Sequence, residues 1–133
     1  MNYQVLDKLI EISRSLKDVP NAHNRHFTFI VRKKRVLSMG WNNGCKTHPK
    51  AKELGYRFDN IHSELAAILN FKYPLDTLEK CVLVNVRVNR FGQLRMAMPC
   101  KRCLLWLSSF GLDSIWYTNH CGQIVRLKSY HAT

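Results

Sequence analysis

The chain has 133 residues and a formal net charge of +12, because 21 lysines and arginines stand against 9 aspartates and glutamates. A chain of this length forms one domain with a real hydrophobic core, so we expect a single domain over residues 1–133. So positive a charge attracts polyanions, which favours phosphate-bearing partners over neutral small molecules. The alternative is a solvated basic surface without a partner.

The N-terminal residues contain no basic segment followed by an apolar run, and no stretch approaches about 18 apolar residues. We therefore expect neither a signal peptide nor a membrane span, no membrane partner, and an intracellular location. The chain has five cysteines, two of them in a C-x-x-C pair. An odd count without an export signal fits metal binding better than a disulfide framework.

The first half of the chain begins with an amphipathic helix, predicted over residues 3–16 from the spacing of its apolar residues. Two β-rich segments follow, over residues 27–31 and 36–41, with a tight turn at Lys33-Lys34 between them. The next segment, residues 45–60, is a long, polar and basic loop.

The second half begins with a mostly buried helix over residues 62–71, for which Asn60 is a candidate N-cap. A strand is predicted over 81–89, and a helix over 100–110 ends with Gly111 as its C-cap. Two short strands close the chain.

The closing strands cover residues 114–118 and 124–128, and their connection is too short for a crossover helix, so they should be antiparallel. The full order is α-β-β-α-β-α-β-β. It predicts a three-layer α/β domain with one mixed five-stranded sheet flanked by helices and a terminal antiparallel hairpin.

Two short strings carry the residues that indicate chemistry, His62-Ser63-Glu64 and Pro99-Cys100-Lys101-Arg102-Cys103. Zn²⁺ is commonly held by imidazole nitrogen and thiolate sulfur, and a catalytic zinc keeps its fourth position for water. His62, Cys100 and Cys103 provide three ligands for one zinc ion per chain. Glu64 is not needed as a ligand, which leaves its carboxylate free to move protons. The alternative is a zinc site without catalysis.

His62 and Cys100 are each expected to begin a helix, where the partial positive charge favours thiolates over thiols. A C-x-x-C at a helix start places both sulfurs on one side of the first turn, and Pro99 fixes the approach of the chain. The two helices should pack side by side on one face of the sheet, so that zinc would connect their first turns.

The two strings resemble the signature of the zinc-dependent cytidine/deoxycytidylate deaminase superfamily, H-x-E followed by P-C-x-x-C. The resemblance covers most of the chain, from the first helix to the final hairpin. It implies a cytidine-deaminase-like fold in a single deaminase domain. It also implies His62, Cys100 and Cys103 as zinc ligands and Glu64 as the proton shuttle for removal of an exocyclic amino group.

Further positions are similar to substrate contacts of that superfamily. Gly40-Trp41-Asn42 looks like the family's G-x-N, which implies that Asn42 bonds the sugar of the target nucleotide. Backbone groups around Ser63 are implied to hold the base, and Tyr117 to contact the base or its neighbours. His48 would line the pocket or lie at the surface. Asn42 and Tyr117 also have structural alternatives, as a turn cap and a core residue.

Three hypotheses for the substrate follow from the residues and the resemblance. The first is cytosine within single-stranded DNA or RNA, with basic loops on the phosphates and aromatic side chains stacking the bases. The second is a free nucleotide such as deoxycytidylate, and the third is a non-catalytic zinc module that binds nucleic acid. The net charge of +12 favours the first.

The predicted terminal hairpin also bears on this choice. Deoxycytidylate deaminases and tRNA-adenosine deaminases usually have a helix between the last two strands, whereas nucleoside deaminases have a hairpin but an all-Cys zinc site. Cytosine is preferred over adenine by analogy alone. The pattern leaves the oligomeric state open.

Overall fold

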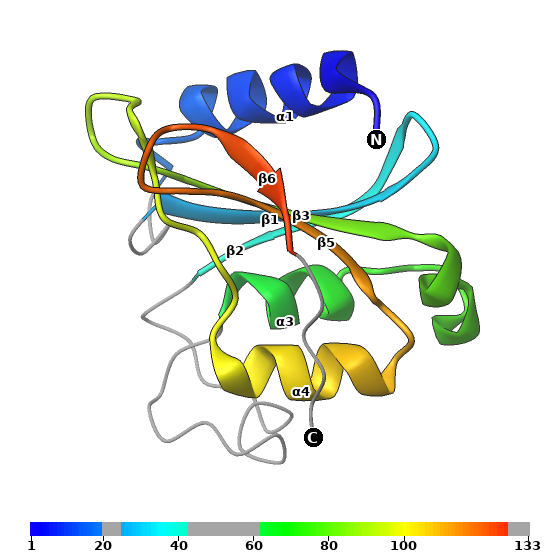
Figure 1. The fold of residues 1–133 in the computed structure, drawn as a ribbon. Helices are drawn as coiled ribbons and strands as arrows, with labels where there is room; N and C mark the ends of the chain where they lie inside the picture. Colours follow the sequence, from blue (N-terminus) through cyan, green and yellow to red (C-terminus); the bar gives the residue numbers. More distant parts are fainter. Residues whose placement is uncertain (20–24, 43–61, 128–133) are drawn as a thin grey trace.

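The computed structural model describes residues 1–19, 25–42 and 62–127 (Figure 1). Its elements, in chain order, are α1 (Tyr3–Ser15), β1 (His26–Arg32), β2 (Arg35–Trp41), α3 (Ser63–Leu69), the 3₁₀ helix η2 (Leu75–Lys80), β3 (Val82–Val88), β4 (Leu94–Arg95), α4 (Lys101–Ser109), β5 (Ser114–Thr118) and β6 (Ile124–Arg126). In these parts of the chain, none of the helices has the length and apolar character needed to cross a bilayer.

The strands form one mixed sheet in the order β2-β1-β3-β5-β6, with β4 paired to β3. The pair β3–β5 is parallel, and the other pairs are antiparallel, including the terminal hairpin β5–β6. The predicted mixed sheet and terminal hairpin are therefore confirmed. The short strand β4 is an addition, because it pairs with the end of β3 at Arg87 and Val88, beyond the part of β3 that β5 reaches.

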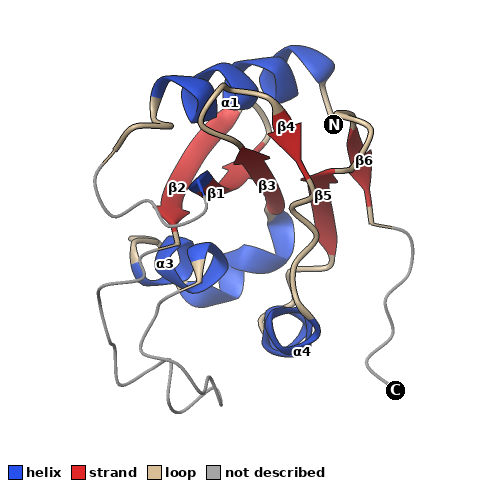
Figure 2. Ribbon diagram, turned by 90° about the vertical axis from the view of Figure 1, so that its left-hand side faces the viewer, coloured by secondary structure: helices blue, strands red, loops and turns tan. Residues whose placement is uncertain are grey.

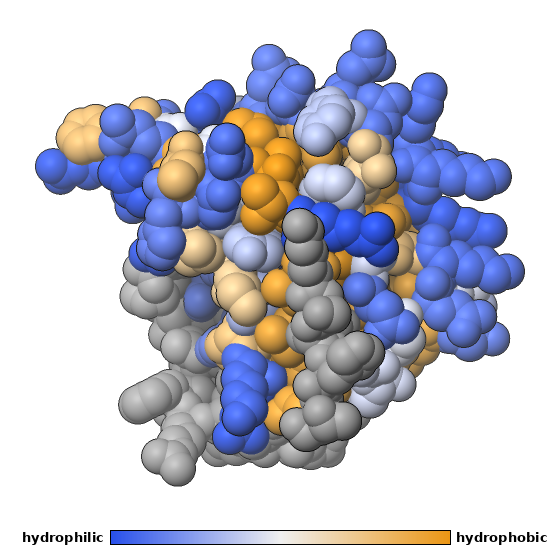
Figure 3. All heavy atoms as spheres, in the orientation of Figure 1, coloured by the Kyte–Doolittle hydropathy of each residue, from blue (hydrophilic) through white to orange (hydrophobic). Residues whose placement is uncertain are grey.

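The sheet is the middle of three layers, with α1 on one face and α3 and α4 on the other (Figure 2). Successive strand residues point to opposite faces, so they supply two separate apolar clusters. Phe27, Phe29 and Val86 pack with α1, whereas Ile30 and Leu83 pack with α3 and α4. On the face shown in Figure 3, hydrophilic residues project around the outline and apolar residues gather toward the middle.

Two predicted helix caps need correction. The N-cap of α3 is His62 rather than Asn60, because the His62 backbone is extended and its carbonyl accepts the N–H of Ala66 at 3.0 Å. The C-cap of α4 is Phe110, and Gly111 follows it with a φ of 78°. Glycine suits that next position because it adopts the left-handed conformation without strain.

Gly40 sets how closely β2 and α3 approach each other. A Cβ at this position would overlap the backbone nitrogen of Ala67 and lie 2.7 Å from the carbonyl carbon of Ala66. Gly40→Ala is therefore expected to lower the free energy of unfolding by about 3 kcal/mol, the upper range for overpacking a rigid site. Urea denaturation measures this loss.

Gly122→Ala is the matched control for that prediction, since a Cβ there meets nothing within 4 Å but the φ of 75° is unfavourable. We expect this control to cost only about 1–2 kcal/mol, the strain of one left-handed residue. An equal or smaller loss for Gly40→Ala would show that β2 and α3 do not approach as closely as described.

Candidate metal and catalytic site

The two signature strings lie at two neighbouring helix starts on the same face of the sheet. His62 is the N-cap of α3 and Cys100 the N-cap of α4, both with extended backbone. The Sγ of Cys100 accepts the backbone N–H of Cys103 at 3.5 Å, which closes the first turn of α4. The expectation that His62 and Cys100 each begin a helix is confirmed.

These helix starts bring His62, Cys100 and Cys103 into one group. The Nδ1 of His62 lies 3.9 Å from the Sγ of Cys100 and 3.5 Å from the Sγ of Cys103. Tetrahedral zinc with its usual bond lengths requires nitrogen and sulfur ligands about 3.6 Å apart. All three ligand atoms lie within 4.8 Å of one another, so the group is able to hold a metal ion, and its donor set suits zinc.

The three side chains of this group differ in how their pKa values are shifted. Hydrogen bonds from Cys103 and from His62 lower the pKa of Cys100 to about 4, against the effect of its burial. Burial, together with the nearby sulfur of Cys100, raises the pKa of Cys103 above its ordinary value. The hydrogen bond to Cys100 raises the pKa of His62. The thiol of Cys100 therefore loses its proton more readily than the thiol of Cys103.

Glu64 lies in the first turn of α3, where it is buried with only 2% of its surface exposed. Its Oε1 accepts a hydrogen bond from Asn85 Nδ2 at 2.9 Å, and the Ser63 hydroxyl lies 3.2 Å away. Burial alone would raise the pKa of Glu64, but His26 and the hydrogen bonds from Cys103 and Asn85 together lower it. The buried side chain is thus held as a carboxylate.

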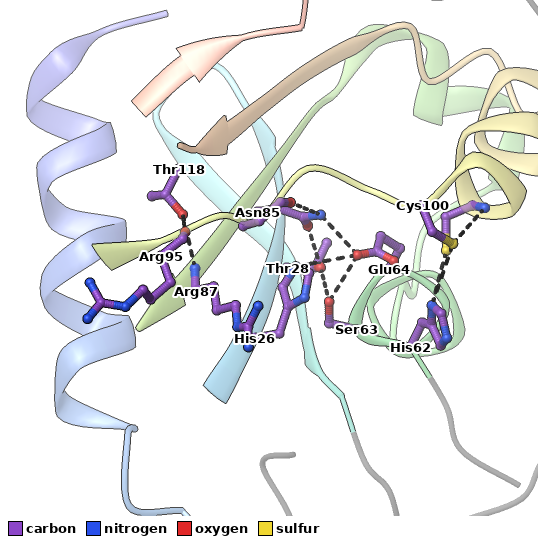
Figure 4. Close-up of polar contacts among 12 residues, drawn as sticks. His26, Thr28, His62, Ser63, Glu64, Asn85, Arg87, Arg95, Cys100 and Thr118 are labelled. Atoms are coloured by element: carbon purple, nitrogen blue, oxygen red, sulfur yellow. Dashed lines mark hydrogen bonds and ion pairs between the residues drawn. The ribbon is translucent and has the colours of Figure 1, made fainter. Parts of the chain in front are cut away.

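A polar network on β1 and β3 fixes the position of that carboxylate (Figure 4). Asn85 Nδ2 points at two groups that only accept, Glu64 Oε1 and the carbonyl of Ala97 at 3.1 Å, which settles the orientation of the amide. Its Oδ1 accepts from Thr28 Oγ1 at 2.6 Å, and Thr28 shares a second hydrogen bond of 2.7 Å with Ser63 Oγ. Thr28, Ser63 and Asn85 thus each have a hydrogen-bond partner within the network.

Sequence reasoning did not single out Thr28 or Asn85. The available signal was Asn85 itself, an amide within the apolar run of β3 that would need a buried partner. Its partners lie in other elements, 21 residues away in the case of Glu64 and 57 in the case of Thr28. No pattern among neighbouring residues of the sequence predicts these contacts of Asn85.

His26, at the start of β1, was also missed. Its Nε2 lies 3.6 Å from Glu64 Oε1 and has no hydrogen-bond partner among the described residues. Burial lowers the pKa of this imidazole, and attraction to Glu64 offsets the effect only in part. His26 is therefore a buried imidazole beside the carboxylate, with one ring nitrogen that no described residue bonds.

The structure describes three of the four expected substrate contacts, Asn42, Ser63 and Tyr117. The backbone N–H of Asn42 donates to the carbonyl of His26 at 3.1 Å, and Asn42 Oδ1 is buried without a hydrogen-bond partner among the described residues. Tyr117 is the neighbour of Asn85 in the parallel β3–β5 register. His48 lies outside the described residues. The roles of Asn42, Ser63 and Tyr117 stay predictions.

Comparisons with known proteins bear on the fold. No family model matches the chain, and no curated protein matches it in sequence. Among solved structures, a dCMP deaminase from the cyanophage S-TIM5 in apo form is similar, with a TM-score of 0.61, 16% identity, and coverage of 90% of this chain and 86% of that one.

The same phage enzyme in complex with dCMP and dUMP matches with a TM-score of 0.60, 15% identity, and coverage of 90% and 85%. The chain therefore has the cytidine-deaminase-like α/β fold. Within that fold it carries a His/Cys/Cys group able to hold a metal ion. The resemblance drawn from the two sequence strings is confirmed in this form.

Proposed function

We propose that the chain is a zinc-dependent hydrolytic deaminase that converts the cytosine of a pyrimidine nucleotide to uracil, with a free deoxycytidine nucleotide as its substrate. The observation that carries the proposal is the group His62, Cys100 and Cys103 beside the buried carboxylate of Glu64. A structural zinc site has no need of a fully buried carboxylate held by its own hydrogen-bond network.

His62, Cys100 and Cys103 would hold the metal. When bound, zinc activates a water molecule by lowering its pKa toward about 7. Glu64 takes one proton from the attacking water and delivers it to the ring nitrogen, then takes the remaining proton of the new hydroxyl group and delivers it to the leaving amine, so that cytosine and water give uracil and ammonia. The network from Thr28 through Asn85 holds Glu64 Oε1 in place during these transfers.

The choice of a free nucleotide differs from the expectation that charge alone suggested. The phage enzyme with the similar fold was solved with dCMP and dUMP, which supports a pyrimidine nucleotide. The comparisons give no support to single-stranded nucleic acid. That reading is kept as the second candidate because of the net charge of +12.

The zinc-loaded protein, incubated separately with deoxycytidine, dCMP and a cytosine-containing single-stranded oligonucleotide, tests the proposal. Uracil formation is followed by mass spectrometry. We expect dCMP to be converted with the highest kcat/KM. Preferred conversion of the oligonucleotide, with steep loss of activity between low and moderate salt, would replace the free nucleotide by a strand. Absence of turnover on all three, in zinc-loaded protein, would refute the deaminase.

A further inference from the structure

A basic cavity lies at the end of β3, beside the candidate active site. Its volume is about 300 Å³, near the lower limit of pockets that hold small ligands. Three guanidinium groups and one imidazole line it, and none of the lining residues that the structure describes is acidic. The principal lining residues are Arg25, Arg87, Arg95, His120, Asn89 and Met96.

The sheet itself brings two of these arginines together. Arg87 of β3 and Arg95 of β4 are direct partners in the antiparallel register, so their side chains leave the same face of the sheet. The Thr118 hydroxyl accepts the backbone N–H of Arg87 at 3.2 Å and donates to the carbonyl of Arg95 at 2.6 Å (Figure 4). The buried hydroxyl of Thr118 in β5 thus bonds to the backbone of both β3 and β4.

Arg25 reaches the cavity from the residue before β1. Its φ of 50° is unfavourable for a residue with a side chain, and its Nε donates to the carbonyl of Lys17 at 2.9 Å. That bond holds the side chain of Arg25, which lines the cavity. Strained backbone of this kind is concentrated at ligand clamps.

In the described part of the chain, no carboxylate neutralises the positive charge of the cavity. There, the ion pairs are Lys17 with Asp18 and, if protonated, His26 with Glu64, so none of the three arginines meets a carboxylate. Guanidinium groups gathered without a counter-ion repel one another, and an oxyanion that accepts several N–H bonds relieves this. Phosphate is the common ligand with that chemistry.

The cavity also lies at the right place relative to Glu64. Arg87 is two residues beyond Asn85 on the same face of β3, which is about 7 Å along the strand. It is also the register partner of His26, whose Nε2 is 3.6 Å from Glu64 Oε1. Going outward from Glu64, the molecule therefore presents His26 and then the guanidinium groups, within the reach of one nucleotide.

We propose that the cavity formed by Arg25, Arg87, Arg95 and His120 binds a phosphate group of the substrate. The proposal rests on the proposed function for the identity of the base. The base would lie against Glu64, the sugar beside Asn42 and His26, and the phosphate among the arginines. The same chemistry serves the 5′-phosphate of a mononucleotide and a backbone phosphate of a strand, and the substrate determines which is bound.

Arg87→Gln and Arg95→Gln test the proposal, with Arg35→Gln as the control because Arg35 is exposed at the far end of β2. Each cavity variant is expected to raise the KM for dCMP about 10- to 100-fold, the effect of losing one charge-assisted hydrogen-bonding group, with little change in kcat. Turnover of deoxycytidine, which has no phosphate, should be unchanged. Arg95 is exposed, so its variant tests the idea even if Arg87→Gln folds poorly.

A second readout does not depend on turnover. Calorimetric titration of the zinc-loaded protein with inorganic phosphate should show binding that weakens at least about tenfold in Arg87→Gln and Arg95→Gln and not in Arg35→Gln. Such a result in a protein that deaminates nothing would keep the phosphate site and remove the proposed function. Loss of oligonucleotide binding without loss of dCMP binding would assign the site to a strand phosphate.

Two results would overturn the phosphate site. One is wild-type affinity for inorganic phosphate, dCMP and the oligonucleotide in both cavity variants. The other is an equal loss of activity on dCMP and deoxycytidine, which would make these arginines structural.

Discussion

Glu64→Gln is expected to lower kcat about 100- to 10,000-fold, the usual contribution of a positioned general acid–base group. Glutamine keeps the shape of the side chain and the acceptor for Asn85 Nδ2, which lies 2.9 Å from the carboxylate oxygen in the native chain. It cannot take a proton from water at neutral pH. The fall should therefore appear in kcat on every accepted substrate, with a small effect on KM.

The zinc content of purified Glu64→Gln should be measured together with its kcat. We expect it to stay near one per chain, because the ligand atoms of His62, Cys100 and Cys103 form a complete group without Glu64. Glu79→Gln, an exposed change of the same kind in η2, is the matched control and should leave both kcat and zinc unchanged. Zinc lost together with activity would make Glu64 a ligand or a structural support and would contradict its role as proton shuttle.

The metal group was predictable because its chemistry is local. The strings around His62 and Cys100 each place their functional atoms within the first turn of one helix, and that geometry follows from spacing alone. The layers of the fold were predictable for a similar reason, since apolar periodicity decides which face of each helix and strand is buried.

The support around Glu64 was not predictable in this way. Asn85 and His26 lie beside the carboxylate, and Thr28 bonds Asn85, only because β1 and β3 pair in one particular register, in which Thr28 is opposite Asn85. A shift of β1 by one residue would turn Thr28 and His26 to the other face of the sheet. The short strand β4, and with it the cavity between Arg87 and Arg95, depends on the same register at the end of β3.

The substrate could not be predicted from the sequence for a different reason. A net charge of +12 favours polyanions in general, but it does not say where the charges meet. In the described part of the chain, three arginines line one cavity of about 300 Å³, a grouping that net charge alone does not predict. The terminal hairpin, which argued against a deoxycytidylate enzyme, is present in a chain whose fold is nevertheless similar to one.

Cys103→Ser is expected to abolish tight zinc binding. Cys103 is fully buried in the first turn of α4, and its Sγ is 3.5 Å from His62 Nδ1. Serine removes one of three protein ligands, so the loss of affinity should exceed the 10- to 100-fold that loss of an outer partner of a metal site costs. Zinc should then no longer raise the melting temperature of the protein, because stabilisation by a ligand depends on its affinity for the folded state.

Zinc binding should also release protons, and the pKa shifts give the sign. Cys100, with a pKa of about 4, is already a thiolate at pH 7. Cys103 and His62 have raised pKa values and keep their protons longer, and both must lose them to bind the metal. Affinity should therefore rise with pH through the neutral range and fall on acidification. Calorimetry in two buffers of different ionisation enthalpy counts the protons released.

Cys121→Ser is the control for both measurements, because Cys121 is an exposed thiol outside the metal group. It should bind zinc and release protons as the native chain does. Full zinc content in Cys103→Ser, or zinc affinity that is independent of pH between about 6 and 8, would contradict binding through the Cys103 thiolate. In that case the arrangement at the two helix starts would be a packing feature, and the proposed deaminase would lose the metal on which its chemistry depends.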